Sequence, residues 1–209
     1  MSFTVTLTGD WSNYASYKRS VSSRFAYRIQ TFLLREALIM RTLIVEEFPT
    51  QGKKLWKPLS PWTIANRRLR RFGGTKALIH SGQLMNSVTA LWDPAKRAAF
   101  AGVLYQTRGK DGKSLVNLAK LHEYGHPGIV IRVSPRMRRF LFFLAKYLPA
   151  HRGSKTRRGA GAGKNMIVVR IPARPFMAPA QRMFLKTDVN GRMRRFFMGL
   201  LDYSGGGKK

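Results

Sequence analysis

Acidic residues are scarce in this sequence. The chain of 209 residues has 39 Lys and Arg against 9 Asp and Glu, so its formal net charge is +30 at pH 7. No acid occurs between Glu47 and Asp93 or between Glu123 and Asp188. Such self-repulsion destabilises an isolated compact chain, so we expect an anionic partner in the working state. Nucleic acid is the usual partner, and a membrane or an acidic protein ring would supply the same compensation.

Cysteine is absent, which excludes disulfides and thiolate metal sites and fits assembly in a reducing cytoplasm. Long hydrophobic runs are absent too. The most apolar run, residues 140–148, is too short to span a bilayer and contains Lys146. Residues 1–11 have neither the basic nor the apolar region of a secretory signal. We therefore expect a soluble protein with no membrane partner, and its 44% hydrophobic residues suffice for a packed core.

The hydrophobic pattern predicts an α+β fold, with a small antiparallel sheet flanked by helices. Apolar residues recur at three- and four-residue steps from residue 16 to residue 48, which predicts a long N-terminal helix ending before Pro49. Ser60 and Pro61 are typical of a helix start. Further helices are expected near residues 62–72, 81–85, 114–124, 137–148 and after Pro179, and strands at residues 3–8, 88–92, 98–105 and 166–171.

Residues 122–126 read His-Glu-Tyr-Gly-His, a literal match to the zinc-peptidase pattern H-E-x-x-H. That chemistry needs both histidines on one face of a continuous helix. Gly125 and Pro127 predict instead that the helix ends between the histidines, with His122 and Tyr124 packed at its end. A zinc metallopeptidase is therefore the least favoured hypothesis. We expect no enzyme, and no catalytic, metal or cofactor-binding residue.

Four short segments occur in an order that matters for the interpretation of the sequence. They are Trp-Lys-Pro-Leu-Ser from Trp56, Leu-Ile-His-Ser-Gly-Gln-Leu from Leu78, Leu-His-Glu-Tyr-Gly from Leu121 and Ile-Pro-Ala-Arg-Pro-Phe from Ile171. Thr63 and Arg67-Arg68 follow the first segment, and Ser87-Val88 follow the second. Together they resemble the virion-morphogenesis or tail-completion family of tailed bacteriophages.

This resemblance implies a structural virion protein, assembled in the host cytoplasm and located in the neck. Such a subunit forms a ring, sixfold or twelvefold, that completes the tail or the connector and joins head to tail around the DNA channel. Its partners would be copies of itself, portal or neck and tail proteins, and the passing genomic DNA. A tail-terminator ring is the alternative of the same class.

The resemblance also divides the expected single domain, residues 1–203. Residues 1–49 would form the N-terminal strand and long helix, residues 50–125 and 166–203 the family-like core, and residues 126–165 a helical and basic-loop insertion. Residues 204–209 are expected to be a disordered tail.

The segment 151–164 is rich in glycine and basic residues and has no apolar anchor. We expect this loop to contact either DNA phosphates in the channel or acidic neck and tail proteins. The cations that would do so are Arg152, Lys155, Arg157, Arg158 and Lys164.

Arg174 lies between two prolines and would be a rigidly presented cation, so we expect it at a subunit interface, unless it caps the final helix. Trp56 and Phe176 are the other interface candidates.

A sequence-independent nucleic-acid-binding protein is the alternative of a different class. The composition favours it. No helix-turn-helix, zinc-finger or RNA-recognition signature supports it, and aromatic residues such as Phe25 and Phe140 fall at apolar helix positions.

Overall fold

The computed structural model describes residues 11–71, 74–146 and 165–205, and the side-chain surroundings within 18–71, 74–146 and 165–200. These residues form seven helices and four strands, an α+β fold as the hydrophobic pattern predicts. The elements are α1 (Trp11–Glu46), α2 (Pro61–Leu69), α3 (Gln83–Asn86), β1 (Val88–Asp93), β2 (Ala98–Val103), α4 (Leu115–Tyr124), β3 (His126–Arg132), α5 (Pro135–Ala145), β4 (Met166–Ile171), α6 (Met177–Lys186) and α7 (Val189–Gly205).

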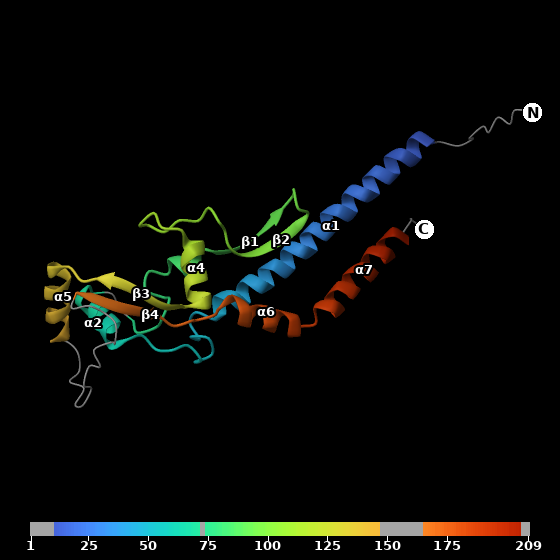
Figure 1. The fold of residues 1–209 in the computed structure, drawn as a ribbon. Coiled ribbons are helices and arrows are strands. Elements are labelled where there is room, and N and C mark those ends of the chain that lie inside the picture. Colours follow the sequence, from blue (N-terminus) through green and yellow to red (C-terminus); the bar gives the residue numbers. More distant parts are fainter. Residues whose placement is uncertain (1–10, 72–73, 147–164, 206–209) are drawn as a thin grey trace, which may run out of the picture.

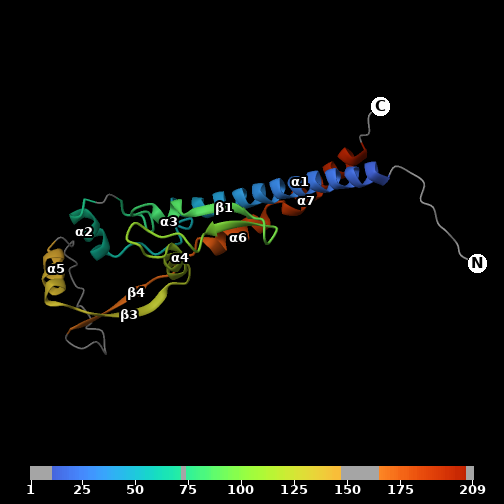
Figure 2. The same cartoon turned by 90° about the horizontal axis from the view of Figure 1, so that it is seen from above.

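Helix α1 is the longest element, with 36 residues and a length of about 54 Å. It starts earlier than the apolar periodicity predicts and ends where Pro49 requires. Figures 1 and 2 show that its N-terminal half extends beyond the rest of the molecule, with α7 alongside it. From Lys18 to Tyr27 every residue of α1 is exposed.

Serine side chains begin three of the shorter helices. Ser60, Ser114 and Ser134 each accept a hydrogen bond from the backbone N–H three residues later. Proline follows directly at Pro61 and Pro135, where its missing N–H removes no helical bond. The predicted helices near 62–72, 114–124 and 137–148 are thus confirmed, although α2 ends at Leu69 and α5 at Ala145.

The strands form two separate two-stranded antiparallel sheets. Strands β1 and β2, both predicted, pair as an antiparallel hairpin, with Val88 opposite Val103 and Asp93 opposite Ala98, and this sheet packs on α1. Strand β3 was not predicted from the sequence. It pairs with β4, which places Ile131 opposite Ile167 and Val130 opposite Val168, with a bulge between His126 and Ile129. The expected insertion 126–165 therefore contributes one strand of the sheet that contains β4.

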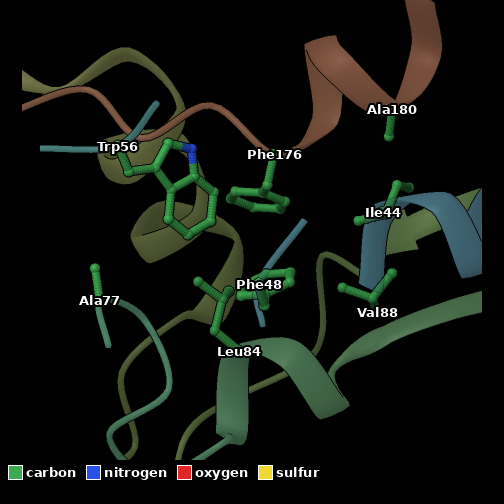
Figure 3. Close-up of a cluster of buried hydrophobic side chains, with 8 residues drawn as sticks. All are labelled: Ile44, Phe48, Trp56, Ala77, Leu84, Val88, Phe176 and Ala180. Atoms are coloured by element: carbon green, nitrogen blue, oxygen red, sulfur yellow. The ribbon is translucent and has the colours of Figure 1, made fainter. Parts of the chain in front are cut away.

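The core lies where the C-terminal end of α1 meets the start of α6 (Figure 3). Phe48 and Phe176 have ring centroids 4.9 Å apart, and Trp56 meets Phe48 edge-on at 6.2 Å. We call these residues the central core: Ile44, Phe48, Trp56, Ala77, Leu84, Val88, Phe176 and Ala180.

The molecule extends in two directions from this core. On one side α1 and α7 run outward, and on the other the β3–β4 ribbon ends at α5 (Figures 1 and 2). Phe32 and Phe196 stack at 4.4 Å between α1 and α7, and Arg192 donates two hydrogen bonds to Glu36, at 2.8 and 2.6 Å. Within its described part the chain has no helix long and apolar enough to cross a membrane.

Candidate functional site

The His-Glu-Tyr-Gly-His segment bends away from helical geometry, as its glycine and proline predict. Helix α4 ends at Tyr124, Gly125 has a φ of 72°, and His126 begins strand β3. The two histidines therefore do not share a helix face. No group of three or more His, Asp or Glu residues within the described part of the chain is arranged to hold a metal ion. The expectation for Tyr124 was wrong, since 81% of its surface is exposed.

Glu123 has a structural role that the sequence analysis missed. Its carboxylate accepts hydrogen bonds from the backbone N–H groups of Phe176 at 2.9 Å, Met177 at 3.0 Å and Ala178 at 2.9 Å. These are the first N–H groups of α6, which has no capping side chain of its own. A carboxylate also interacts favourably with the positive end of the helix dipole. Glu123 thus joins α4 to α6 across more than fifty residues of sequence, a separation that no local pattern reveals.

Arg174 contacts carbonyl oxygens of its own chain. Its guanidinium donates to the carbonyl of Lys57 at 3.2 and 3.1 Å and to that of Pro58 at 3.5 Å. Its backbone N–H donates to the His122 carbonyl at 2.7 Å. Arg174 is only 6% exposed, so the structure corrects the expectation of a subunit contact. It does not cap a helix either. Instead it fixes the segment before α2 to the segment before α6.

Trp56 and Phe176, the other two interface candidates, also belong to the central core. They are 8% and 0% exposed. The Trp56 indole N–H donates to the Pro175 carbonyl at 3.0 Å, across 119 positions of sequence. An aromatic ring with one hydrogen bond and the rest of its surface in apolar packing is a typical buried tryptophan. These residues hold the chain together from within.

The centre of the molecule contains a cluster of basic groups formed by Arg67, His122 and Arg174. Arg67 donates to the carbonyls of Gly74 at 3.3 Å and Lys76 at 2.8 Å. Burial lowers the pKa of both arginines, and the Arg67 charge lowers the pKa of Arg174 further. Burial also lowers the pKa of the His122 imidazole, as does the charge of Arg174, and the His122 Nδ1 atom is buried without a hydrogen-bond partner among the described residues. Carbonyl oxygens, not carboxylates, therefore satisfy the arginines of this cluster.

The four segments that carry the phage resemblance all take part in this centre. Trp56 packs there with Leu84 of the second segment, Glu123 of the third binds the start of α6, and Arg174 and Phe176 of the fourth connect to the other three. The pattern therefore describes a packing unit.

The five cations of the predicted channel loop, Arg152, Lys155, Arg157, Arg158 and Lys164, lie outside the described residues. The predicted strand at residues 3–8 lies outside them too. The disordered tail was expected to begin at residue 204, but residues 204 and 205 belong to α7, and residues 206–209 lie outside the described residues.

Exposed apolar side chains are numerous at both ends of the molecule. Among the residues whose side chains the structure describes, twenty-four large hydrophobic residues are exposed, whereas thirteen hydrophobic residues are buried. At one end, α1 exposes Phe25 at 40% and Tyr27 at 69%. At the other, the ribbon exposes Val130 at 61% and Val168 at 50%, which face the same side because they are paired across the strands. Surfaces of this kind usually mark contacts with other molecules.

Helix α5, at the far end of the ribbon, combines apolar and basic residues on its outer face. Phe142 is 75% exposed and lies within one turn of Arg138 and Arg139, whereas the buried Leu144 lies on the opposite face. Aromatic residues and arginine are the types enriched at the centres of protein interfaces.

Comparisons of the chain with protein-family models, with curated proteins and with solved structures found no match.

Proposed function

We propose that this chain is a structural subunit of a tailed-bacteriophage neck. Copies of it form a ring that completes the tail or the connector and joins head to tail around the DNA channel. The observation that carries the proposal is the distribution of apolar surface: the central core is small, and both ends that extend from it expose large hydrophobic side chains. A subunit that finishes its packing on neighbouring molecules has this form.

The phage assignment is supported by the four segments described above. They meet in one packed centre, so they act as a packing unit in this fold. The net charge of +30 adds support, because a ring around DNA benefits from cations that are not neutralised within the subunit.

The ribbon is the part of the subunit best suited to a neighbouring chain. A two-stranded sheet is marginal in water on its own, and neither β3 nor β4 has a second strand partner among the described residues. Val130 and Val168 then present an apolar patch beside open backbone edges. Addition of a neighbour's strand, or of an apolar surface, would cover both.

Electron microscopy of phage particles with an early stop codon in this gene tests the role. Filled heads beside separate tails of normal length are the expected result. Overlong tails would indicate the tail-terminator alternative, and normally joined virions would exclude a neck role.

A finer test uses exposed positions that folding does not need. Val130→Lys should leave the free energy of unfolding of the isolated chain within about 0.5 kcal/mol of the original, yet abolish head–tail joining, because it charges the ribbon face. Tyr105→Lys changes a residue that is 85% exposed elsewhere, and should join normally. Equal joining by both variants would remove the ribbon from the interface.

A sequence-independent nucleic-acid-binding protein is the second candidate, favoured by the outer face of α5. There an exposed aromatic ring lies within one helical turn of two arginines, an arrangement that also stacks on bases and binds phosphates. Binding curves for unrelated DNA sequences test it. This candidate requires sequence-independent affinity that falls steeply with salt and is lost in Phe142→Ala.

A further inference from the structure

A pocket of about 350 Å³ opens beside the central core, between the turn after α1 and helix α6. Apolar walls are formed by Trp56, Pro175, Pro179 and Met183. Three cations, Lys53, Arg182 and Lys186, belong to the same lining and are exposed at the surface. The single acid of the lining, Glu47, is only 3% exposed. The pocket thus has an apolar interior and a positively charged mouth.

The turn that forms one wall has an unusual backbone. Gln51, Gly52, Lys53 and Lys54 have φ values of 54°, 60°, 54° and 67°. Side chains other than glycine rarely adopt this left-handed region, and successive residues almost never do. Strained segments of this kind persist only where the surrounding structure holds them, and they gather at functional sites.

Several contacts hold this turn in place. The Gln51 amide donates to the carbonyls of Phe48 at 2.6 Å and Ala77 at 3.1 Å, and accepts from the Ala77 N–H at 2.6 Å. The Gly52 N–H donates to the Glu47 carbonyl at 2.9 Å. A Cβ atom on Gly52 would lie 2.3 Å from the indole nitrogen of Trp56, so the turn packs directly on that ring. The result is a rigid edge that presents Leu55, 86% exposed, at the pocket.

We propose that this pocket binds an apolar side chain carried by an acidic segment of another protein. The apolar walls and Leu55 take up the side chain, and the cations at the mouth attract the acids on either side of it. This assignment deepens the neck role, on which it rests for the place of the partner in the particle.

The charge of the chain excludes a second copy as the occupant. Its 9 acids include just one adjacent pair, Glu46 and Glu47, and Glu47 is buried, so the chain has no acidic segment to offer. A nucleic acid fits less well than a protein. Trp56 is 8% exposed, which leaves no free ring face for a base to stack on.

The test uses the full chain and three short labelled peptides. The first has acidic residues on both sides of a central Phe, the second has Ser in place of the Phe, and the third has Gln in place of the acids. Fluorescence anisotropy at physiological salt should detect binding of the first peptide, and affinities at least about tenfold lower for the other two.

Charge-reversed variants locate the site. Arg182→Glu with Lys186→Glu should lower the affinity for the first peptide at least about tenfold. The matched control, Lys96→Glu with Arg194→Glu, makes the same change in net charge at exposed positions outside the lining, and should bind nearly as well as the original chain. Leu55→Ser changes an exposed side chain, so it leaves folding intact. It should lower the affinity for the first peptide and leave the affinity for the Ser-containing second peptide unchanged.

Equal binding of the Phe and Ser peptides would overturn the proposal, because it would indicate a general attraction between opposite charges. Equal losses in both charge-reversed variants would overturn it as well. So would a short single-stranded DNA that displaces the first peptide and loses affinity with the same two substitutions. None of these results depends on the particle. If no peptide binds while loss of the gene separates heads from tails, the pocket assignment fails and the neck role stands. If the first peptide binds as expected but loss of the gene leaves heads and tails normally joined, the pocket assignment stands and the neck role fails.

Discussion

Gly125 ends α4 in a conformation that only glycine adopts without strain. Its φ is 72°, and a Cβ atom would lie 2.7 Å from the Ala173 nitrogen and 2.8 Å from the Ile171 carbonyl oxygen. Gly125→Ala should therefore lower the free energy of unfolding by about 2–4 kcal/mol, from left-handed strain and from displacement of the β4–α6 segment. Urea denaturation of the two proteins measures the difference.

Gly112 supplies the matched control for Gly125. Its φ is 75°, and no atom lies within 4 Å of the position a Cβ would take. Gly112→Ala should lower the free energy of unfolding by only about 1–2 kcal/mol, from left-handed strain alone. Equal costs at the two positions would mean that the close approach of the Ala173 backbone to Gly125 contributes nothing.

His122 should make stability depend on pH. Burial and Arg174 lower its pKa in the folded chain below the ordinary 6.5, so between these two values the unfolded chain binds more protons. The free energy of unfolding should therefore fall as the pH is lowered from about 7.5 to about 5.5. The free energy of unfolding should depend less on pH in His122→Gln.

Comparison of His122→Gln with the original chain at each pH isolates this effect. Glu47 acts in the opposite direction, because burial raises the pKa of its carboxyl, but that contribution is common to both proteins and cancels. A stability difference between the two proteins that stays constant across this range would contradict the assignment.

Sequence reasoning was least reliable for single side chains. It assigned Trp56, Arg174 and Phe176 to a subunit interface, Arg174 because a cation between two prolines is rigidly presented. Their hydrogen-bond partners lie 117 and 119 positions away for Arg174 and Trp56. No local pattern indicates such pairings. Gly125 was read correctly, because a glycine followed closely by a proline constrains the backbone by itself.

At the scale of elements, the contact between α1 and α7 depends on the ion pair of Glu36 and Arg192. The side chain of Glu36 is 9% exposed and that of Arg192 is 22% exposed, and their closest atoms are 2.6 Å apart. Arg192→Leu should lower the free energy of unfolding by about 1–3 kcal/mol, because it leaves the Glu36 carboxylate buried and uncompensated. The cost is below that of a fully buried pair because Arg192 is partly in solvent.

A double-mutant cycle separates the pair from its surroundings. The combined variant Glu36→Leu, Arg192→Leu should be more stable than Arg192→Leu alone, since the stranded charge is removed and both side chains become apolar. If adding Glu36→Leu to Arg192→Leu lowers the free energy of unfolding further, the two residues do not act as an ion pair. The same contact includes the Phe32–Phe196 stack, which both variants keep.

Elements with strong local signals were predicted well. The long helix, the β1–β2 hairpin and the Ser-capped helices each have a periodicity or a cap in the sequence. Strand β3 was missed because Pro127 and Gly128 weaken its start, and its apolar run, Ile129 to Ile131, is short. The pairing with β4 that makes it a strand comes from residues 34–45 positions later in the chain. The tertiary partner, not propensity, decides this element.

The whole molecule combines a small core with two extended ends, and its charge opposes compaction. Because each copy repels the next, rings should form when a partner or DNA compensates the charge, and the isolated chain should remain unassembled at low salt. Assembly that waits for charge compensation explains how a chain with a net charge of +30 can expose apolar surface and still remain unassembled on its own. In the proposed ring, apolar contacts would supply the attraction between neighbours, and an anionic partner would determine when that attraction exceeds the repulsion.

Salt should therefore stabilise the isolated chain. Raising the ionic strength from about 10 mM to about 150 mM shortens the screening length from about 30 Å to about 8 Å, which weakens repulsion among the 39 basic residues far more than it weakens the few ion pairs. The free energy of unfolding, measured by urea denaturation in NaCl, should rise across this range. Sucrose at matched osmolality separates screening from exclusion effects, because it leaves the charges unscreened. A fall in stability with NaCl would mean that close ion pairs such as Glu36–Arg192 outweigh the long-range repulsion, and that the net charge does not govern when this chain assembles.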